Sequence, residues 1–165
     1  MATNEILILQ PTDEAGLLAS QAFNEFLRRW KNDLPNSAVI EHVGATAVPG
    51  CLTKGDLDIC IRVDPEDFEA AAERLALSFE RNSGSVRSDG FSAFMDNAAH
   101  PPLGVQLVTK GGELDFFVRF RDRLRESANL LSSYNDLKRR FEGRDMEDYR
   151  SVKTDFIQQA ISRNS

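Results

Sequence analysis

Two aspartates separated by one residue are the strongest chemical signal in this sequence. Asp56 and Asp58 lie in KGDLDICIRV, at the start of an apolar, strand-like run. Residues two apart on a strand face the same way, ~6.6 Å apart along the backbone. Two such carboxylates can hold one divalent cation, and Mg²⁺ prefers oxygen ligands. The alternative is that Asp56 belongs to the preceding turn and only Asp58 enters the strand, as an ion-pair partner.

The second half of the chain supplies cationic side chains at helical spacing. Arg121 and Arg125 are one helical turn apart and could clamp an anion, although Asp122 and Glu126 offer competing ion pairs. Both interpretations stay open from the sequence.

Two Tyr-Lys pairs follow. Tyr134 with Lys138, and Tyr149 with Lys153, are each four residues apart, so each pair lies on one face of a helix. These pairs either line a ligand cleft that faces the sheet or support one another where helices pack.

The composition narrows the class of protein. The chain of 165 residues fits one domain, which would bury ~70% of its unfolded surface. Its 26 acidic and 20 basic side chains leave a net charge of -6, which disfavours stable nucleic-acid binding. Small nucleotides stay compatible, because a local Lys or Arg cluster with Mg²⁺ can still hold a phosphate.

The cysteines and the apolar runs indicate a cytoplasmic protein without a membrane span. Cys51 and Cys60 have neither CxxC spacing nor a His cluster nearby, so we expect buried, reduced thiols. No apolar run approaches the ~20 residues that a membrane span needs, and the first residues lack the features of a signal peptide.

Periodicity predicts the elements that position these groups. A helix follows Pro11, and the apolar residues at helical spacing in it are Leu18, Ala22, Phe23, Phe26, Leu27, Trp30 and Leu34. Strands are predicted over 38–43, 58–63, 90–95 and 103–109, and further helices over 65–79, 113–126, 129–142 and 146–162.

The order of these elements predicts an α+β fold. A mixed sheet is packed with helices, and a helical layer forms the carboxyl-terminal part from about residue 113. We expect a single domain over residues 1–165.

Several segments resemble one known family. IEHVGATAVPG, followed by Lys54 and an Asp-Ile pair, is similar to the hallmark of the GrpB family, which reads approximately IEHIGSTAVPGL, then AKP, then IIDILV. FVRFRDRLR and both Tyr-Lys pairs also resemble family positions in the same order, and the similarity extends from Ile6 to about Ile161. The family in turn resembles a branch of the polymerase-beta-type nucleotidyltransferases, which implies a nucleotidyltransferase-like fold.

The resemblance assigns roles to the turn and to the acids. It implies that Gly44, Ala45 and Thr46 form a phosphate-binding turn and that Asp56 and Asp58 are the catalytic, Mg²⁺-binding pair. A glycine lets backbone N–H groups approach phosphate, and Mg²⁺ neutralises charge that develops during nucleotidyl transfer.

Other residues are candidates for supporting roles. His42 precedes the turn and either orders it through a ring hydrogen bond or is a packed core histidine. Lys54 matches a family Lys and is expected to contact phosphate, the alternative being a solvated turn residue. The full set of predicted phosphate or nucleotide contacts is Gly44, Ala45, Thr46, Lys54, Arg121, Lys138 and Lys153.

Two departures from the superfamily pattern put the reaction in doubt. Ala45 replaces the usual Ser and removes a phosphate-binding hydroxyl. Active enzymes of the superfamily need a third carboxylate on a later strand, where this chain has Gln106, which cannot act as a base. Asp96 on a neighbouring strand is a possible substitute.

The sequence therefore predicts a protein that binds a nucleotide or another phosphorylated small molecule with Mg²⁺, with nucleotidyl transfer as the reaction if the site is active. The alternative is a catalytically degenerate binding or interaction module of the same fold. A carboxylate within metal-sharing distance of Asp56 and Asp58 would separate the two.

Overall fold

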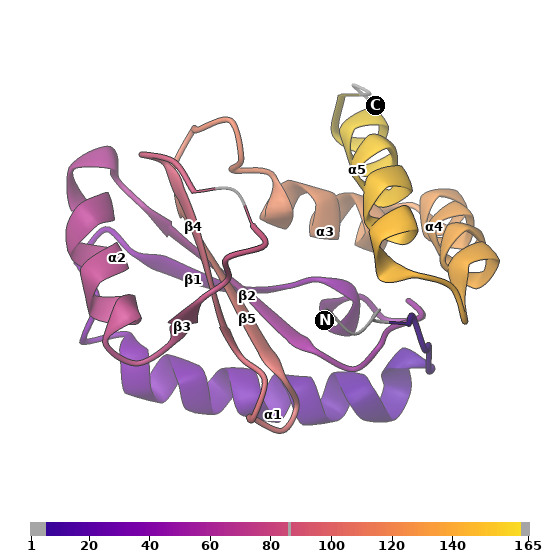
Figure 1. Cartoon of the computed structure of the whole chain (residues 1–165), viewed down its shortest axis with the longest axis horizontal. Helices are drawn as coiled ribbons and strands as arrows, with labels where there is room; N and C mark the ends of the chain where they lie inside the picture. Colours follow the sequence, from indigo (N-terminus) through magenta and orange to yellow (C-terminus); the bar gives the residue numbers. More distant parts are fainter. Residues whose placement is uncertain (1–5, 86, 163–165) are drawn as a thin grey trace.

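A computed structural model describes residues 6–85 and 87–162, and within them the chain forms one five-stranded sheet. The strands are β1 Val39–Val43, β2 Leu57–Val63, β3 Glu80–Arg81, β4 Phe91–Asp96 and β5 Leu103–Thr109. Their order is β1-β2-β5-β4-β3, and β2 runs parallel to β5 while the other neighbours are antiparallel (Figure 1). The sheet is mixed, as predicted.

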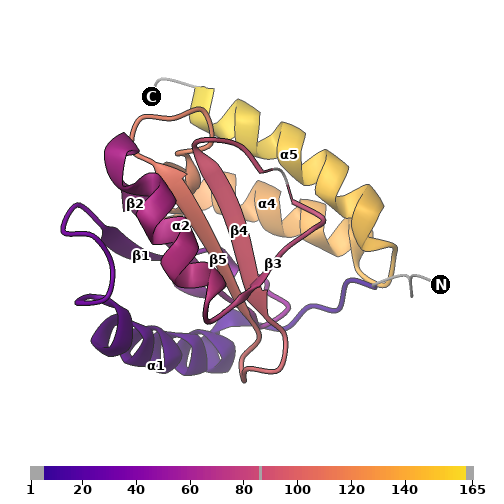
Figure 2. The ribbon, with the colours of Figure 1, turned by 60° about the vertical axis from the view of Figure 1, so that its left-hand side comes forward.

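Helices cover both faces of this sheet. They are α1 Thr12–Trp30, α2 Phe68–Ala76, α3 Phe117–Glu126, α4 Ala128–Phe141 and α5 Met146–Ser162, with short 3₁₀ turns η1 Ala45–Ala47 and η2 Pro65–Asp67. Helices α1 and α2 lie on one side of the sheet, and α3, α4 and α5 lie on the other (Figure 2). The α+β prediction, with a helical carboxyl-terminal layer, is confirmed.

Asp58 is the second residue of β2, whereas Asp56 lies before the strand, as in the alternative left open by the sequence. Alternate side chains on a strand point to opposite faces, and the apolar set Leu57, Ile59, Ile61 and Val63 is buried against α1 and α2. Asp58 therefore belongs to the opposite face, which looks toward the carboxyl-terminal helices. The alternation that buries one face of β2 directs its carboxylate toward the other.

Helix α1 differs in detail from the prediction. Its buried face contains Ala15, Ala19, Phe26 and Trp30, whereas Leu18 is 52% exposed. The helix ends at Trp30, earlier than predicted, and Leu34 packs against the core from the following turn. The predicted core face is otherwise confirmed, since Ala22 and Phe23 also pack against the core, and Leu18 is the exposed exception.

The carboxyl-terminal helices attach to the sheet through α3. Phe117 and Val118 of α3 pack against β4 and β5, and aromatic contacts then tie α4 and α5 to α3. The Phe120 and Tyr134 rings are 5.3 Å apart, and the Tyr134 and Phe156 rings are 5.2 Å apart. This packing holds α4 and α5 opposite the part of the sheet that carries Asp58.

Two further predictions concern thiols and membranes. Cys51 and Cys60 are both buried free thiols, as expected. Among the described helices, none has both the length and the apolar composition required to cross a bilayer.

Candidate functional site

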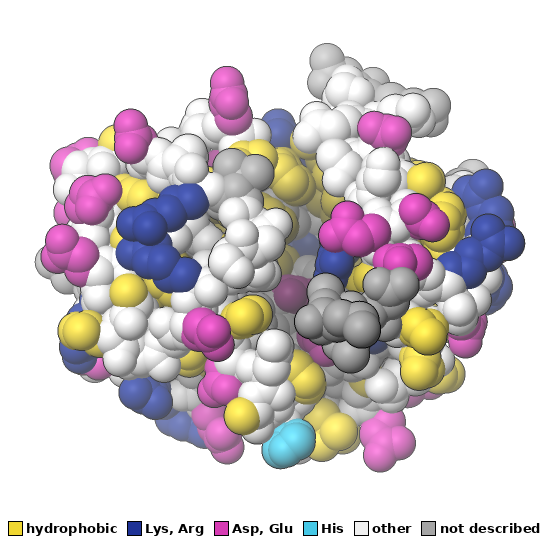
Figure 3. Space-filling view, viewed as in Figure 1, with side chains coloured by type: hydrophobic (Ala, Val, Ile, Leu, Met, Phe, Trp, Pro, Cys, Tyr) yellow, Lys and Arg dark blue, Asp and Glu magenta, His cyan; other side chains and the backbone are white. Residues whose placement is uncertain are grey.

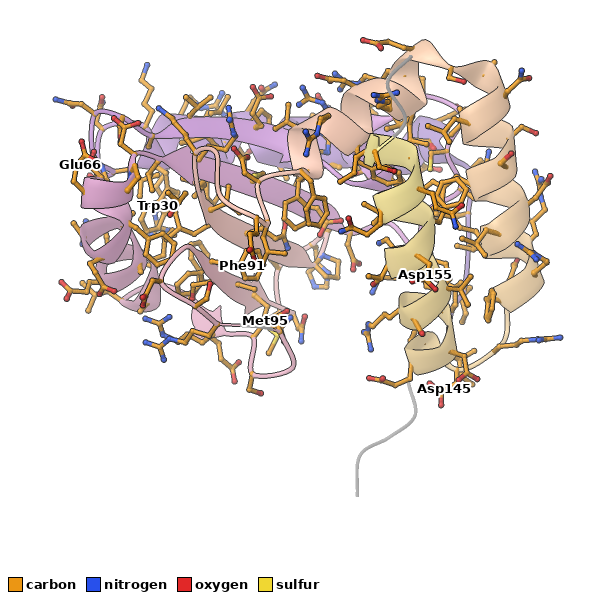
Figure 4. The ribbon with its side chains drawn as sticks, turned by 90° about the horizontal axis from the view of Figure 1, so that it is seen from above. Trp30, Glu66, Phe91, Met95, Asp145 and Asp155 are labelled. Atoms are coloured by element: carbon orange, nitrogen blue, oxygen red, sulfur yellow. The ribbon has the colours of Figure 1, made fainter. Side chains whose placement is uncertain are left out.

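A cleft of about 370 Å³ lies between the sheet and helices α4 and α5. Figure 3 shows a hollow in this region with acidic and basic side chains inside it, and Figure 4 shows α5, which carries Asp155, facing the strand that carries Met95. The sheet side of the cleft contributes Asp56, Asp58, Gly104 and Gln106. The helix side contributes Tyr134, Lys138, Tyr149, Arg150 and Lys153.

The turn after β1 approaches Asp58 closely. Gly44 has φ 76° and ψ -175°, a conformation that is essentially restricted to glycine. A Cβ atom on Gly44 would lie 2.9 Å from Asp58 Cβ and closer still to its carboxylate. A Cβ on Gly104, across the sheet from Asp58, would lie 3.0 Å from Asp58 Oδ1. Two glycines thus make room for one carboxylate.

The electrostatic setting of Asp58 combines burial with several charges. Burial raises the pKa of Asp58, and the neighbouring Asp56 carboxylate raises it further. The ammonium groups of Lys153, Lys54 and Lys138 act in the opposite direction on this pKa. Lys54 Nζ also lies 3.1 Å from Asp56 Oδ2, so the two acids share one electrostatic environment with three lysines.

Lys138 is a buried ammonium group at the helix side of the cleft. Its Nζ donates to the Leu52 carbonyl oxygen at 2.6 Å and lies 4.6 Å from the centre of the Tyr134 ring. Burial lowers the pKa of Lys138 to about 8. The ammonium group therefore changes its charge within a pH range that is accessible to binding measurements.

The second Tyr-Lys pair repeats this geometry on α5. Lys153 Nζ lies 5.8 Å from the centre of the Tyr149 ring, and the two tyrosine hydroxyls are 3.5 Å apart. All four residues of the two pairs line the cleft. The two Tyr-Lys pairs therefore contact each other where α4 and α5 pack, and they also line the cleft that faces the sheet.

A chain of hydrogen bonds under the turn connects His42 to the loop that carries Asp56. The Thr46 hydroxyl donates to the Asp56 carbonyl oxygen at 3.0 Å, and Thr46 Oγ1 lies 2.9 Å from His42 Nε2. Because the hydroxyl proton is used for Asp56, His42 Nε2 is the donor to Thr46. Burial, with the charges of Arg125 and Arg121, lowers the pKa of His42 to about 4, so the ring is neutral. His42 thus contacts the turn through its ring hydrogen bond and also packs against the core, where its ring stacks on Phe23.

Thr46 itself differs from its predicted orientation. Its side chain is buried beneath the turn, and Ala45, not Thr46, lines the cleft. The hydroxyl that the sequence suggested for phosphate is engaged in holding the loop of Asp56, because the 3₁₀ turn η1 directs position 46 inward.

Arg121 is also absent from the cleft walls. Its guanidinium donates to Glu41 Oε2 at 2.6 Å, to Asp122 Oδ1 at 2.9 Å and to the His42 carbonyl oxygen at 3.0 Å. Arg125 donates to the Ala47 carbonyl oxygen at 2.7 and 2.9 Å. The guanidinium groups of the predicted anion clamp thus attach α3 to β1 and to the turn, because Arg121 bonds Glu41, Asp122 and the His42 carbonyl and Arg125 bonds the Ala47 carbonyl.

The strand position expected to hold a third acid carries an unpartnered amide. Gln106 lines the cleft on β5, and its Oε1 atom is buried without a hydrogen-bond partner. Asp96 does not replace it: its Oδ1 accepts from the Ala98 N–H in the turn after β4, away from the cleft lining. Among the described residues, the acids of this cleft are Asp56 and Asp58, and no group of three His, Cys, Asp or Glu residues could hold a metal.

One cationic residue of the cleft was missed in the sequence. Arg150 lines the cleft three residues before Lys153, which places both on one side of α5. The same helical spacing that drew attention to Tyr149 and Lys153 could have identified it.

Comparison with known proteins shows the family to which this chain belongs. Residues 18–163 match the family described as GrpB protein. A UPF0157 protein of Vibrio cholerae is 35% identical over 131 residues, which cover 79% of this chain and 69% of the relative. A UPF0157 protein of Halalkalibacterium halodurans is 27% identical, with 86% and 75% covered. The chain belongs to the GrpB family.

Solved structures share the fold. The crystal structure of conserved protein GrpB from Enterococcus faecalis superposes with a TM-score of 0.71 at 18% identity, covering 94% of this chain and 98% of that one. A structure of the Cid1 poly(U) polymerase, an H336N mutant bound to MgATP, gives a TM-score of 0.52 at 13% identity. The match covers 78% of this chain and 42% of Cid1. The fold is therefore nucleotidyltransferase-like, as predicted.

Proposed function

We propose that this GrpB-family chain binds a nucleotide or another phosphorylated small molecule in the cleft, together with a divalent cation at Asp56 and Asp58. The observation that carries the proposal is the charge of the cleft. Four cationic side chains, from Lys54, Lys138, Arg150 and Lys153, line it together with two acids. Although the whole chain has a net charge of -6, the cationic side chains in this cleft outnumber the acidic ones.

This arrangement suits a phosphate ester better than a neutral ligand. Ammonium and guanidinium groups donate to phosphate oxygens, and charge-assisted bonds of this type are stronger than neutral ones. Gly44 packs against Asp58 and the next residue of the turn, Ala45, lines the cleft, which supports the predicted contact between a phosphate and the N–H groups of the turn. The acids would repel the same phosphate unless a cation lay between them.

The donor set fits a hard divalent cation. Asp56 and Asp58 supply carboxylate oxygens, and the buried Gln106 Oε1 is an amide oxygen without a partner. Carboxylate and amide oxygens are the ligands that Mg²⁺ and Ca²⁺ take in proteins. A bound cation would neutralise charge on the phosphates, and Asp56, Asp58 and Gln106 are the residues that would hold it.

The presence of Gln106 favours a protein that binds the nucleotide without converting it. A carboxylate could accept a proton from an attacking hydroxyl, whereas an amide cannot. Nucleotidyl transfer is the second candidate, and it is favoured by the fold that the chain shares with Cid1. The two differ in whether bound nucleotide releases pyrophosphate.

Calorimetric titration of nucleoside triphosphates with and without Mg²⁺ tests the proposal. We expect Mg²⁺-dependent binding in the wild type and a loss of at least about tenfold in affinity for Asp58→Asn, since even outer-shell changes at metal sites cost 10- to 100-fold. Asp96→Asn is the matched control, because this aspartate lies outside the cleft lining.

Stability measurements on the same variants test whether a loss of nucleotide affinity is caused by unfolding. Asp58 is a partly buried carboxylate whose pKa is raised by desolvation, so we expect Asp58→Asn to unfold at the same or a higher denaturant concentration than wild type. Equal Mg²⁺-dependent affinity in wild type and Asp58→Asn would remove the metal from the proposal, and absence of any nucleotide or phosphate binding would remove the proposal itself.

A further inference from the structure

A second, smaller cavity of about 180 Å³ lies beside the cleft; we call it the apolar chamber. Aromatic side chains from the start of α3 and the residue before it form much of its wall, with aliphatic residues completing it. These residues are Phe116, Phe117, Phe120, Leu124 and Ile157. The chamber is thus lined mainly by apolar groups, in contrast to the charged cleft.

The chamber adjoins the proposed phosphate site. Five residues line both cavities: Ala45, Asp58, Gln106, Tyr134 and Lys153. Asp58 on β2 is opposite Gly104 of β5, and Gln106 follows two residues later on the same face of β5, so the shared wall contains the proposed cation-binding groups. One molecule can therefore have its phosphate in the cleft and another part in the chamber.

The charged residue that lines the chamber and not the cleft already has protein partners. Arg121 contributes to the wall, but its guanidinium donates to Glu41, Asp122 and the His42 carbonyl oxygen. The polar side chains of Asp58, Gln106 and Lys153 belong to the wall shared with the cleft, whereas the Gly44 backbone lines the chamber alone. A ligand part that enters beyond the shared wall meets mainly apolar side chains, beside the Gly44 backbone and Arg121.

The volume of the chamber limits what can enter. An apolar cavity of about 150 Å³ is known to hold one benzene molecule. At about 180 Å³, the chamber accepts one ring with small substituents. Partly exposed aromatic rings at its wall, such as Phe116 and Phe117, offer faces and edges for ring contacts.

We propose that the ligand of this protein is a phosphorylated small molecule with a single-ring apolar group, which occupies the chamber while the phosphate occupies the cleft. The inference rests on the proposed function, since it takes the position of the phosphate from it. The chamber then determines which phosphorylated molecules are selected.

Phenyl phosphate and inorganic phosphate are suitable probes, each titrated calorimetrically with Mg²⁺ present. They share the phosphate and differ in the ring. Burial of a phenyl group should make phenyl phosphate bind roughly 10- to 100-fold more tightly than inorganic phosphate in the wild type.

Ile157→Trp tests whether the chamber causes this preference. Ile157 is partly buried on α5, and an indole at this position would fill the chamber. We expect the preference for phenyl phosphate to vanish while the affinity for inorganic phosphate is retained, which also shows that the variant folds. Ile161→Trp is the matched control, one helical turn further on, partly buried and outside the chamber wall; it should keep the preference.

The outcomes separate this inference from the proposed function. Equal affinities for both probes in the wild type would overturn the chamber as a ligand site and leave phosphate binding intact. A preference that survives in Ile157→Trp would also overturn it. Failure of both probes to bind a wild type that still binds nucleoside triphosphates would overturn this inference alone, and failure of the nucleotides as well would overturn the proposed function.

Discussion

Gly44 and Asp58 are packed so closely that the turn after β1 leaves no space for a Cβ atom beside the carboxylate. Such an atom would lie 2.9 Å from Asp58 Cβ and 3.0 Å from its Cγ. The backbone of Gly44 also has φ 76°, where an L residue is strained. The predicted phosphate turn and the predicted metal ligand are therefore one structural unit.

This relationship predicts the effect of Gly44→Ala on stability. In Gly44→Ala, backbone strain should lower the free energy of unfolding by about 1–3 kcal/mol. The collision with Asp58 should lower it further, so we expect a larger loss than strain alone causes. Gly143→Ala is the control, because Gly143 has φ 80° and its Cβ would meet nothing within 4 Å. Chemical denaturation of both variants checks this, and equal losses would show that Asp58 moves aside without cost.

The lowered pKa of Lys138 predicts a pH-dependent affinity. Below about pH 8 its ammonium is charged and attracts a phosphate, and above this value the folded protein without ligand loses the charge. Binding of an anion then requires proton uptake, so affinity should fall by up to about tenfold for each pH unit above 8. Titration of inorganic phosphate between pH 7 and 10 measures this dependence.

Lys138→Arg provides the comparison, since a guanidinium stays protonated throughout that range. We expect its phosphate affinity to vary less above pH 8, after circular dichroism has shown that it folds. The same decline in both proteins would assign the effect to another group.

The lowered pKa of His42 predicts that acid reduces the stability of the protein. Its pKa is about 4 in the folded chain and near 6.5 when unfolded, so the unfolded state binds the proton more tightly. Stability should therefore fall as pH decreases from about 6.5 to about 4, with a contribution of up to about 3 kcal/mol from this ring.

Denaturation curves of His42→Asn across this pH range should show a shallower decline than those of the wild type. His100→Asn is the matched control, because His100 is exposed in the connection between β4 and β5. A slope that depends on His100 and not on His42 would contradict the prediction.

Gln106 predicts binding without appreciable turnover. A missing general base typically costs 10²- to 10⁴-fold in rate, so we expect nucleoside triphosphate to bind and pyrophosphate release to be slow or undetectable. Gln106→Asp supplies a carboxylate beside Asp58 and should increase Mg²⁺-dependent release with a panel of acceptors. Asn97→Asp adds an acid elsewhere in the cleft and should not. Brisk release by the wild type, unchanged in Gln106→Asp, would show that the base lies elsewhere.

Several features of this protein were determined by the sequence alone. The apolar alternation of β2 places Asp58 on the face opposite Ile59 and Ile61, because a strand has a period of two. The i, i+4 spacing of Tyr134 with Lys138 places both on one face of α4, because a helix has 3.6 residues per turn. Local periodicity is sufficient for such relationships.

Contacts between distant segments determine which polar groups stay available to a ligand. Thr46 donates to the Asp56 carbonyl and Arg121 donates to Glu41, whereas Gln106 Oε1 has no partner. These outcomes depend on whether another segment brings a suitable group within about 3 Å, a distance at which hydrogen bonds form. Spacing along the chain gives the face on which a side chain lies, but its partners follow from packing between segments that are far apart in sequence.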